Sequence, residues 1–296
     1  MPKIESTRDE LETLCLIDEA TDARAFLAPA RGGLLTRFTV AGVPVLYMDP
    51  ATLRDPAQSV RGGIPVLFPI AGKLPGGQYT WRGQTYAMKQ HGFARNLPWQ
   101  LLESAAGAEG AQVTLGLESS ALTRAQYPFE FALRFVYRLR GGVLSVEQTF
   151  ENCGPHEMPI QPGLHPYFYV PDARKAEVRL ETDATRAYDN VGAREVDLQG
   201  PLRFGEREID MHLLDQAARE VVLERPGMPA VRVGFDADQH VLVVWTLPGR
   251  DFVCVEPWSD KFGALADGTA RLLSPGERAR TTLVISLHAS ERSDPR

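Results

Sequence analysis

Residues 131–152 read FALRFVYRLRGGVLSVEQTFEN, and this stretch decides the fold class. In its first half, apolar side chains alternate with less apolar ones, at Phe131, Leu133, Phe135, Tyr137 and Leu139. Alternation with a period of two places one set of side chains on a single face of an extended strand. The glycine pair at 141–142 interrupts the run, and a second strand-like run follows. The stretch is therefore predicted to be a β-hairpin.

The same pattern recurs along the chain as short β-branched or aromatic runs bounded by Gly, Pro or Asp. Such runs occur at 34–48, 79–88, 111–119, 176–183, 230–237, 240–258 and 278–289. Helical periodicity is weak, and one short helical turn is expected near MHLLDQAAR, 211–219. Strands do not alternate with long helices as a parallel sheet requires. We therefore predict an all-β protein, a large antiparallel β-sandwich, with any site on its concave face or at its strand ends.

Composition is that of an ordinary globular protein with 296 residues, 44% hydrophobic, and 32 basic against 38 acidic side chains. No linker, repeat or low-complexity tract divides the chain. We expect one domain over 1–296, with an ordered core at about 12–289 and polar tails. The start lacks a signal-peptide pattern and no apolar run is long enough to span a bilayer, so a cytoplasmic protein without membrane contact is expected. A monomer or homodimer is expected, and the mild negative charge disfavours nucleic acid as a partner.

Several common chemistries lack their sequence motifs. The chain has no GxGxxG, no GxxxxGK[ST], no GxSxG and no HExxH, which removes most support for nucleotide cofactors and serine hydrolysis. Its six histidines are scattered singly, and its three cysteines lack CxxC spacing. No metal site and no disulfide framework is predicted.

Three polar residues stand in aromatic stretches punctuated by Pro or Gly: His91 in QHGFARN, His165 in QPGLHPYFYV and Glu256 in FVCVEPWS. Such stretches turn at strand ends, where side chains can point into a cleft. A single histidine is more often a hydrogen-bonded core or surface residue. Glu256 is the sharpest candidate, because strand alternation places it with Phe252 and Cys254, where a carboxylate is costly without a partner or a role. Apolar surroundings would raise its pKa and suit it to act as a general base.

Between residues 56 and 102 the chain has no Asp or Glu, but it has five basic residues. At the average acidic content, a stretch of this length would hold about six acids. The bias predicts an anion-attracting patch around RGGIP and HGFARN. The alternative is that these cations are solvated residues at strand edges. The five are Arg61, Lys73, Arg82, Lys89 and Arg95.

Four dispersed motifs, in order, resemble the galactose mutarotase-like superfamily of aldose 1-epimerases: RGGIPVLFPIAGKL, QHGFARNLPW, GLHPYFYV and CVEPW. The resemblance covers about residues 25–287 and implies a β-supersandwich that interconverts the α and β anomers of an aldose without a cofactor. It implies that Glu256 takes the proton of the anomeric hydroxyl and that His165 protonates the ring oxygen. It also implies that His91 supports this transfer and that Arg61 binds sugar hydroxyls.

The resemblance leaves the substrate open between a neutral sugar and a sugar phosphate. RGGIPVLFP and HGFARN are similar to hexose-6-phosphate 1-epimerases, which makes Arg61 and Arg95 candidate phosphate ligands. The longer stretch 68–95 is similar to a bacterial subgroup found beside lactose-utilisation genes, which favours an unphosphorylated aldose. Asp210, in EREIDMHLLD, is a candidate sugar-binding carboxylate, although a solvated surface acid is the commoner reading.

Two other function classes fit parts of the sequence. A non-catalytic carbohydrate-binding or sensing sandwich would use the aromatic residues of PYFYV and PWS for stacking. It would not need both an acid and a base, so the joint presence of His165 and Glu256 favours an enzyme. A glycoside hydrolase or lyase would need two carboxylates around the bond, and only Glu256 has a convincing setting.

Overall fold

The predicted hairpin is present in the computed structural model, which describes residues 1–8, 11–205 and 207–288. Strand β11 (Phe131–Arg140) pairs antiparallel with β12 (Val143–Asn152), and Arg140 lies opposite Val143. The two residues between them, Gly141 and Gly142, have φ of 59° and 74°. A two-residue turn of this kind needs positive φ at both positions, which glycine adopts without a steric penalty.

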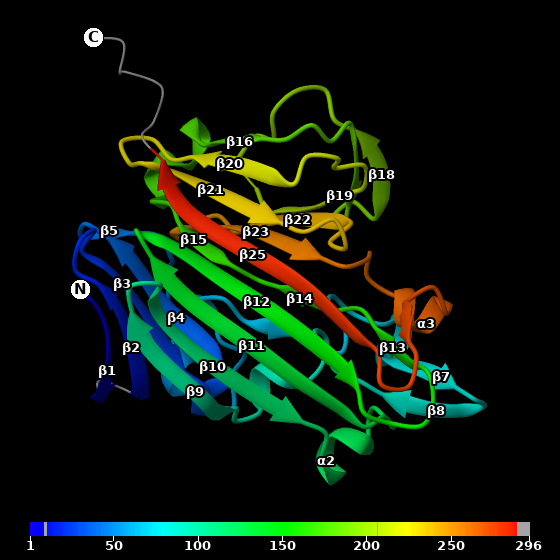
Figure 1. Ribbon diagram of the computed structural model, residues 1–296. Coiled ribbons are helices and arrows are strands. Elements are labelled where there is room, and N and C mark those ends of the chain that lie inside the picture. The colour runs from blue at the N-terminus through cyan, green and yellow to red at the C-terminus, as the bar shows by residue number, and fades with distance from the viewer. Residues whose placement is uncertain (9–10, 206, 289–296) are drawn as a thin grey trace.

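The hairpin lies at the centre of an eight-stranded antiparallel sheet, whose long strands cross the front of the molecule in Figure 1. The sheet is not ordered by sequence, because the last strand β25 pairs with both β12 and β21. In spatial order its strands are β16 (Arg179–Glu181), β20 (Glu220–Glu224), β21 (Ala230–Phe235), β25 (Arg278–His288), β12, β11, β10 (Gly110–Glu118) and β9 (Gln100–Gly107).

A second sheet of eight strands lies behind the first, with β22 and β23 side by side behind β25 (Figure 1). Its path is β18 (Arg194–Asp197), β17 (Arg186–Asp189), β19 (Ile209–Leu213), β22 (Val241–Thr246), β23 (Phe252–Trp258), β14 (Gly163–Leu164) and β6 (Val66–Leu67). Strand β15 (Tyr167–Tyr169) also pairs with β23. Strand β23 therefore has β22 on one side and two short strands, β14 and β15, on the other.

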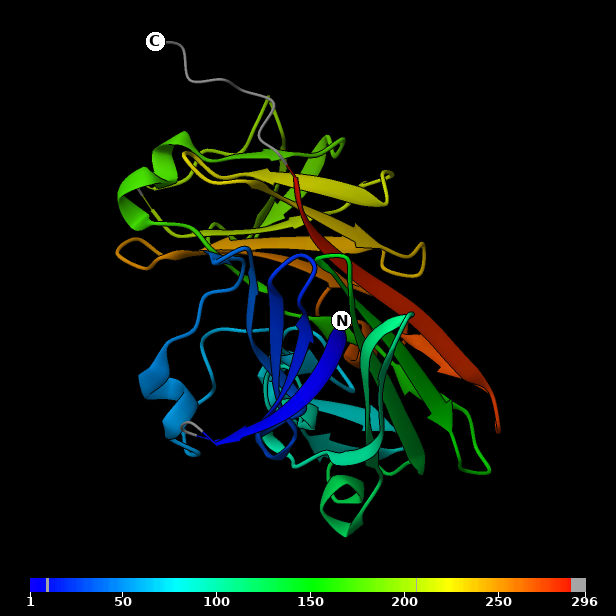
Figure 2. The same ribbon diagram turned by 60° about the vertical axis from the view of Figure 1, so that its left-hand side comes forward.

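A five-stranded sheet formed by the N-terminal part of the chain completes the layers, and Figure 2 shows it in blue at the front. Its strands are β1 (Pro2–Arg8), β2 (Glu12–Asp18), β3 (Ala23–Ala28), β4 (Leu34–Val40) and β5 (Val43–Pro44). Two small sheets pair β7 (Gln78–Trp81) with β8 (Gln84–Ala87) and β13 (Met158–Ile160) with β24 (Arg271–Leu273).

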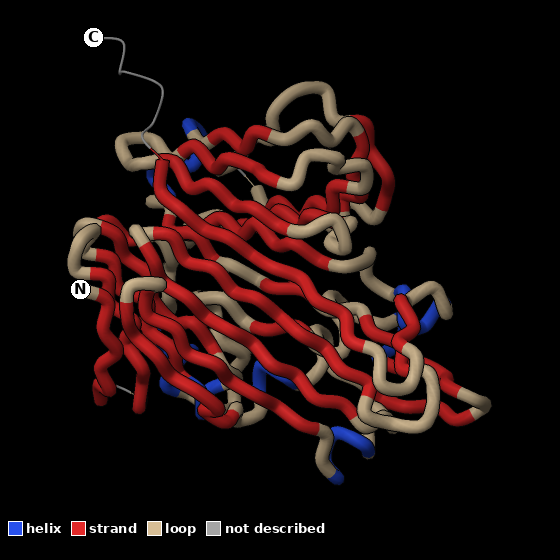
Figure 3. The backbone as a smooth tube through the Cα atoms, in the orientation of Figure 1, coloured by secondary structure: helices blue, strands red, loops and turns tan. Residues whose placement is uncertain are grey.

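Helical segments are short and peripheral, as Figure 3 shows in blue against the red strands. They are the α-helices α1 (Pro50–Arg54), α2 (Ala121–Arg124) and α3 (Ala264–Asp267), and the 3-10 helices η1 (Pro29–Arg31), η2 (Pro75–Gly77), η3 (Ala94–Asn96) and η4 (Asp172–Glu177). The all-β antiparallel sandwich predicted from the sequence is confirmed.

All three large sheets contribute side chains to one contiguous apolar core. Phe38 comes from the five-stranded sheet, Phe135 and Phe150 from the first eight-stranded sheet, and Val255 from the second. The alternation of the strands explains this arrangement, because every second residue of a paired strand faces the same layer. Burial of these side chains is the main favourable contribution to folding.

Two features differ from the sequence expectations. The short helical turn predicted at 211–219 is wrong, because 209–213 form β19, which pairs with β17 and β22. The apolar residues Ile209, Met211 and Leu213 alternate there, and pairing with β22 decides the conformation. At the other end of the chain, β1 pairs with β2 over residues 2–8, before the expected start of the core near residue 12. The expected core boundary at 289 lies outside the described residues.

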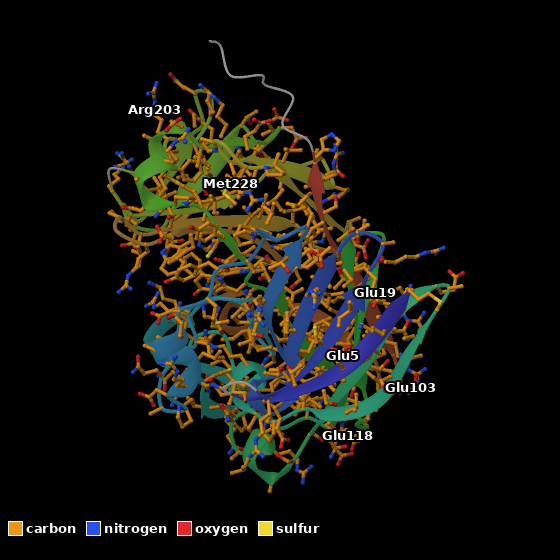
Figure 4. All side chains as sticks on the ribbon, turned by 90° about the vertical axis from the view of Figure 1, so that its left-hand side faces the viewer. Glu5, Glu19, Glu103, Glu118, Arg203 and Met228 are labelled. Carbon is orange, nitrogen blue, oxygen red and sulfur yellow. The ribbon has the colours of Figure 1, made fainter. Side chains whose placement is uncertain are left out.

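Charged side chains line the outer edge of the N-terminal sheet. Figure 4 shows Glu5 and Glu19 there, and both form ion pairs with Lys3. Charges on an edge strand disfavour pairing with strands of other molecules. In the part of the chain that the structure describes, no helix is long and apolar enough to cross a membrane.

Candidate active site

All six residues singled out from the sequence line one cavity of about 320 Å³. They come from distant parts of the chain: the segment before β6, the turn before η3 and η3 itself, the segment between β14 and β15, and strands β19 and β23. The six are Arg61, His91, Arg95, His165, Asp210 and Glu256. The fold thus brings the sequence motifs together at one place.

Glu256 lies on β23, where strand alternation sorts side chains between two environments. Val253 and Val255 join the apolar core, whereas Glu256 and Trp258 line the cavity. The Glu256 side chain is only 2% exposed, and one of its oxygens, Oε2, accepts a hydrogen bond from Trp258 Nε1 at 3.2 Å. Burial, assisted by the Asp210 carboxylate, raises the pKa of Glu256 well above its ordinary value. A raised pKa makes this carboxyl group a stronger base once it is ionised.

His165 lies directly against this carboxyl group, with Nδ1 3.2 Å from Glu256 Oε1. The contact lacks hydrogen-bond geometry, and Nδ1 has no hydrogen-bond partner among the described residues. The imidazole stacks on the Tyr167 ring, with ring centres 4.6 Å apart and planes at 5°. Burial, and secondarily the Arg95 guanidinium, lowers the pKa of His165 well below its ordinary value. The acid and the base candidates are therefore adjacent, and their pKa values move toward each other.

His91 is fixed by its own backbone turn. Its N–H donates to Gly72 O at 2.7 Å, and the Gly72 N–H donates back to His91 Nδ1 at 3.0 Å. Because Nδ1 accepts, the neutral ring carries its proton on Nε2. Burial, and then Arg95, lowers the pKa of His91, which favours this neutral form. The ring centre lies 5.6 Å from that of His165, and Nε2 lies 3.1 Å from the side-chain amide of Gln90, which also lines the cavity. With its proton on Nε2, His91 is a hydrogen-bond donor beside the acid–base pair, and the Gln90 amide then turns its oxygen toward this proton.

The turn that carries His91 depends on the next residue. His91 and Gly92 have φ of 65° and 66°. A Cβ on Gly92 would lie 2.2 Å from Phe68 O, the oxygen that accepts hydrogen bonds from the N–H groups of Phe93 and Ala94. Only glycine fits at this position, and this explains the HG pair in the motif.

Two arginines add positive charge to the cavity. Arg61 is exposed, and its guanidinium carbon lies 5.2 Å from the centre of the Trp245 ring. In the described ranges its side chain has no ion pair with an acid. Arg95 is half-buried and donates to Gln90 O at 3.1 Å, while its buried Nε has no partner in the same ranges. Lys73 also lines the cavity, so three of the five basic residues of the acid-free stretch meet here.

Acidic side chains also line the cavity. Asp210 accepts a hydrogen bond from Asn190 Nδ2 at 2.6 Å and lies 3.4 Å from His212 Nε2. Asp210 is on strand β19, and its side chain is 21% exposed at the cavity. His212 and Asn190 also line the cavity and were missed from the sequence. Reading IDMHL as a strand would have placed His212 on the same face as Asp210.

Aromatic side chains form much of the remaining surface. Trp245, Trp258 and Phe262 line the cavity together with Tyr167. Trp245 was missed because VLVVWT reads as a buried strand from its local pattern alone. Aromatic faces beside polar groups are suited to the C–H faces and the hydroxyl groups of a sugar ring.

One group of potential metal ligands occurs within the described residues. The ligand atoms of His165, Cys254 and Glu256 all lie within 4.8 Å of one another. Burial raises the pKa of the Cys254 thiol well above its ordinary value, which disfavours the thiolate that a metal would need. Burial also raises the pKa of Glu256, so this set favours protons over a cation.

Comparisons with known proteins agree with the geometry. Residues 18–286 match the family described as aldose 1-epimerase. The chain is 32% identical over 264 residues to an Escherichia coli K12 protein named "Putative glucose-6-phosphate 1-epimerase", across 84% of this chain and 83% of that protein. It is 27% identical over 260 residues to the plasmid LacX protein of Lactococcus lactis subsp. lactis, across 79% of this chain and 84% of that protein.

Solved structures give the same result for the fold. The Slr1438 protein of Synechocystis sp. PCC 6803 has a TM-score of 0.92 and 35% identity, covering 98% of this chain and all of that one. The galactose 1-epimerase of Lactobacillus acidophilus NCFM has a TM-score of 0.78 and 15% identity, covering 97% and 98% of the two chains, and shows likeness of fold alone. The family match over nearly the whole sequence, together with the E. coli relative, establishes that the chain belongs to the aldose 1-epimerase family.

Proposed function

We propose that the protein is an aldose 1-epimerase that interconverts the α and β anomers of an aldose by general acid–base ring opening. The observation that supports this most strongly is the buried pair of Glu256 and His165, with Oε1 and Nδ1 3.2 Å apart at the wall of the cavity. In a cyclic aldose the anomeric hydroxyl oxygen and the ring oxygen are bonded to the same carbon. An acid and a base that serve these two oxygens must therefore lie close together, as these two residues do.

Ring opening then proceeds by two coupled proton transfers. Glu256 takes the proton of the anomeric hydroxyl, and the electron pair of that O–H bond forms the carbonyl bond to the anomeric carbon. The bond between this carbon and the ring oxygen breaks, and the ring oxygen takes a proton from His165. After rotation about the bond from the aldehyde carbon to its neighbour, the reverse steps close the ring on either face. No electrons or protons are gained or lost, so no cofactor is needed.

His91, Asp210 and the arginines have supporting roles in this proposal. The Nε2–H of neutral His91 donates a hydrogen bond near the ring oxygen. The Asp210 carboxylate binds sugar hydroxyls and raises the pKa of Glu256. Arg61 and Arg95, which line the same cavity, bind further hydroxyl groups of the sugar. A non-catalytic sugar-binding protein would need none of the proton chemistry that the burial of Glu256 and His165 makes possible.

A phosphorylated aldose is the second candidate substrate. The Arg61 guanidinium, which has no acidic partner in the described ranges, and Lys73 line the cavity and suit a dianionic phosphate. The E. coli relative, named for glucose 6-phosphate, favours the same substrate class. A cytoplasmic location and a monomeric or homodimeric state stay predictions.

The test is anomer exchange measured by NMR saturation transfer on glucose, galactose and glucose 6-phosphate. We expect acceleration of at least one sugar, also after dialysis against a chelator. If glucose 6-phosphate is preferred, Arg61→Gln should raise its KM much more than that of glucose. An unchanged ratio of the two KM values would remove Arg61 as a phosphate ligand. No acceleration of any sugar, together with sugar-dependent thermal stabilisation, would favour the non-catalytic binding protein.

A further inference from the structure

A second cavity of about 270 Å³ lies apart from the candidate active site, which measures about 320 Å³. It is lined by residues of β12 and β25 from one eight-stranded sheet, and by residues beside β14 and after β23 from the other. Figure 3 shows β12 and β25 running side by side in front of the second sheet. The residues that line this cavity are all different from those that line the active site. It is therefore a separate pocket of similar size.

Buried polar side chains without partners converge on this cavity. Gln148 is 1% exposed and Thr281 is 7% exposed, and they lie directly opposite each other on β12 and β25. Within the described residues, Gln148 Nε2 and Thr281 Oγ1 have no hydrogen-bond partner. Ser259 Oγ, from the segment after β23, is likewise buried and unpartnered there. All three side chains line the cavity.

This convergence is not expected of a purely structural interior. A buried donor or hydroxyl group without a partner is unfavourable, and most native proteins satisfy such groups. An apolar core at these positions would use Leu or Val, as the neighbouring strand positions do, for example Leu144 and Leu283. The polar groups are therefore placed to bind a molecule inside the cavity.

The charges around the cavity indicate what kind of molecule it takes. Four ionised side chains line it, the acids Asp238 and Asp260 and the bases Arg271 and Arg280, so their formal charges cancel. Arg271 is already paired with Asp238 at 2.7 Å and lies 3.5 Å from a Glu277 oxygen. The buried polar groups without partners are an amide and two hydroxyls, which carry no charge. These features suit a neutral ligand with several hydroxyl groups and not an anion.

Apolar side chains also line the second cavity. Phe150 and Ile160 line the cavity beside the polar groups. A ring that presents C–H groups on its faces and hydroxyl groups at its edge contacts both kinds of surface. We propose that this cavity is a second binding site, for a small neutral polyhydroxylated molecule of monosaccharide size, held by Gln148, Ser259 and Thr281. The proposal goes beyond the epimerase reaction, since none of these residues lines the catalytic cavity.

The experiment uses the Gln148 side-chain amide as a reporter. The NH₂ resonances of this group are assigned in the ¹⁵N-labelled protein by through-bond experiments and confirmed by their loss in Gln148→Met. Methyl α-D-glucopyranoside is then titrated into the wild type and into Glu256→Gln. This probe is neutral and cannot open its ring, so its binding is independent of turnover. We expect saturable shifts of the Gln148 NH₂ resonances in both proteins.

A matched pair of variants tests the contact. Thr281→Val keeps the shape of the side chain but removes the hydroxyl group, and we expect the affinity to fall about fivefold or more. Thr282→Val makes the same change on the opposite face of β25 and should leave the affinity unchanged. Thr281→Val should also keep its thermal transition, because it removes an unpartnered buried hydroxyl.

The outcomes separate this proposal from the proposed function. Absence of a saturable shift at Gln148 would overturn the second site, whether or not the protein accelerates anomer exchange. Shifts produced by inorganic phosphate but not by the glucoside would overturn the neutral ligand class. Saturable shifts in a protein without any epimerase activity would leave the second site standing alone.

Discussion

The three residues closest to the proposed chemistry, Glu256, His165 and His91, share one physical property, which is burial. Burial disfavours the charged form of each group, so it raises the pKa of Glu256 and lowers the pKa of both histidines. The motifs predicted these residues, because each motif sets its polar residue among Pro, Gly and aromatic side chains. The partners Asn190 and Trp245 could not be predicted, since they depend on which strands pair. His212 was missed because 209–213 was not recognised as a strand.

The pH dependence follows from the shared proton of the acid–base pair. The active form of the pair holds one proton, with Glu256 as the base and His165 as the acid. At low pH a second proton blocks Glu256, and at high pH the last proton is lost and His165 cannot donate. We therefore expect a bell-shaped profile of kcat/KM.

The acidic limb of this profile depends on Asp210, because protonation of Glu256 blocks the base. The Asp210 carboxylate raises the pKa of Glu256, so Asp210→Asn should lower that pKa and move the acidic limb to lower pH. Asp22→Asn, at an exposed turn, is the control and should leave the limb in place. A limb that stays fixed or moves to higher pH in Asp210→Asn would contradict the assignment of Asp210.

His91→Asn tests the role of the Nε2–H donor. Asparagine tolerates the positive φ at this position, and its side-chain oxygen can accept from the Gly72 N–H. The turn should therefore survive, while kcat/KM falls about tenfold or more because the donor no longer reaches the cavity. Anomer exchange and thermal unfolding are measured on the same sample. Loss of folding without a specific kinetic loss would instead support a structural histidine.

At the scale of elements, the site depends on a few turns that the strands hold in place. The predicted hairpin at 131–152 is present, and the run at 79–88 forms β7 and β8, because alternation and turn glycines act locally. The helical turn expected at 211–219 is wrong, because the conformation of 209–213 depends on pairing with β17 and β22, which are distant in sequence. Local patterns therefore predicted the hairpin and the strand-like runs, but not a strand whose conformation depends on pairing with distant segments.

Two glycine substitutions distinguish the effect of positive φ alone from that of positive φ combined with a steric clash. Gly92→Ala introduces both a positive φ of 66° and a contact of 2.2 Å with Phe68 O, so we expect a loss of about 3 kcal/mol or more in the free energy of unfolding. Gly141→Ala has a φ of 59° but open space around its Cβ, so we expect a loss of about 1–2 kcal/mol. Denaturant unfolding measures both.

The kinetic consequences should differ as well. Gly92→Ala shifts the turn that positions His91, so kcat/KM for anomer exchange should fall. Gly141→Ala lies in a hairpin turn that does not line the cavity and should retain wild-type kinetics. Equal stability losses, or equal kinetic losses, in the two variants would contradict the role given to the turn at 91–92.

At the scale of the whole molecule, the fold class could be predicted but the strand order could not. Strand alternation carries no information about which strands become neighbours, and the last strand β25 pairs with β12 and β21. The second cavity follows from that order, because Gln148 and Thr281 meet only when β12 and β25 pair. Neither residue stands out in the sequence, where both read as ordinary strand positions.

The expectation of one domain over residues 1–296 leads to a prediction about unfolding. Because all three large sheets contribute to one contiguous core, we expect far-ultraviolet circular dichroism and tryptophan fluorescence to change together in a single urea transition. Trp245 and Trp258 report on the second sheet, whereas Trp99 packs against Phe135 of the first. Two separated transitions would divide the chain into independent units.

The central claim is that Glu256 and His165 open the sugar ring as base and acid. The most direct test is saturation transfer between the anomers of the preferred sugar with wild type and Glu256→Gln, which keeps the shape and removes the base. Thr114→Val is the control, because Thr114 is buried and lines neither cavity. We predict that exchange falls about 10²-fold or more in Glu256→Gln and stays near wild type in Thr114→Val. Wild-type exchange in a folded Glu256→Gln protein would contradict the mechanism.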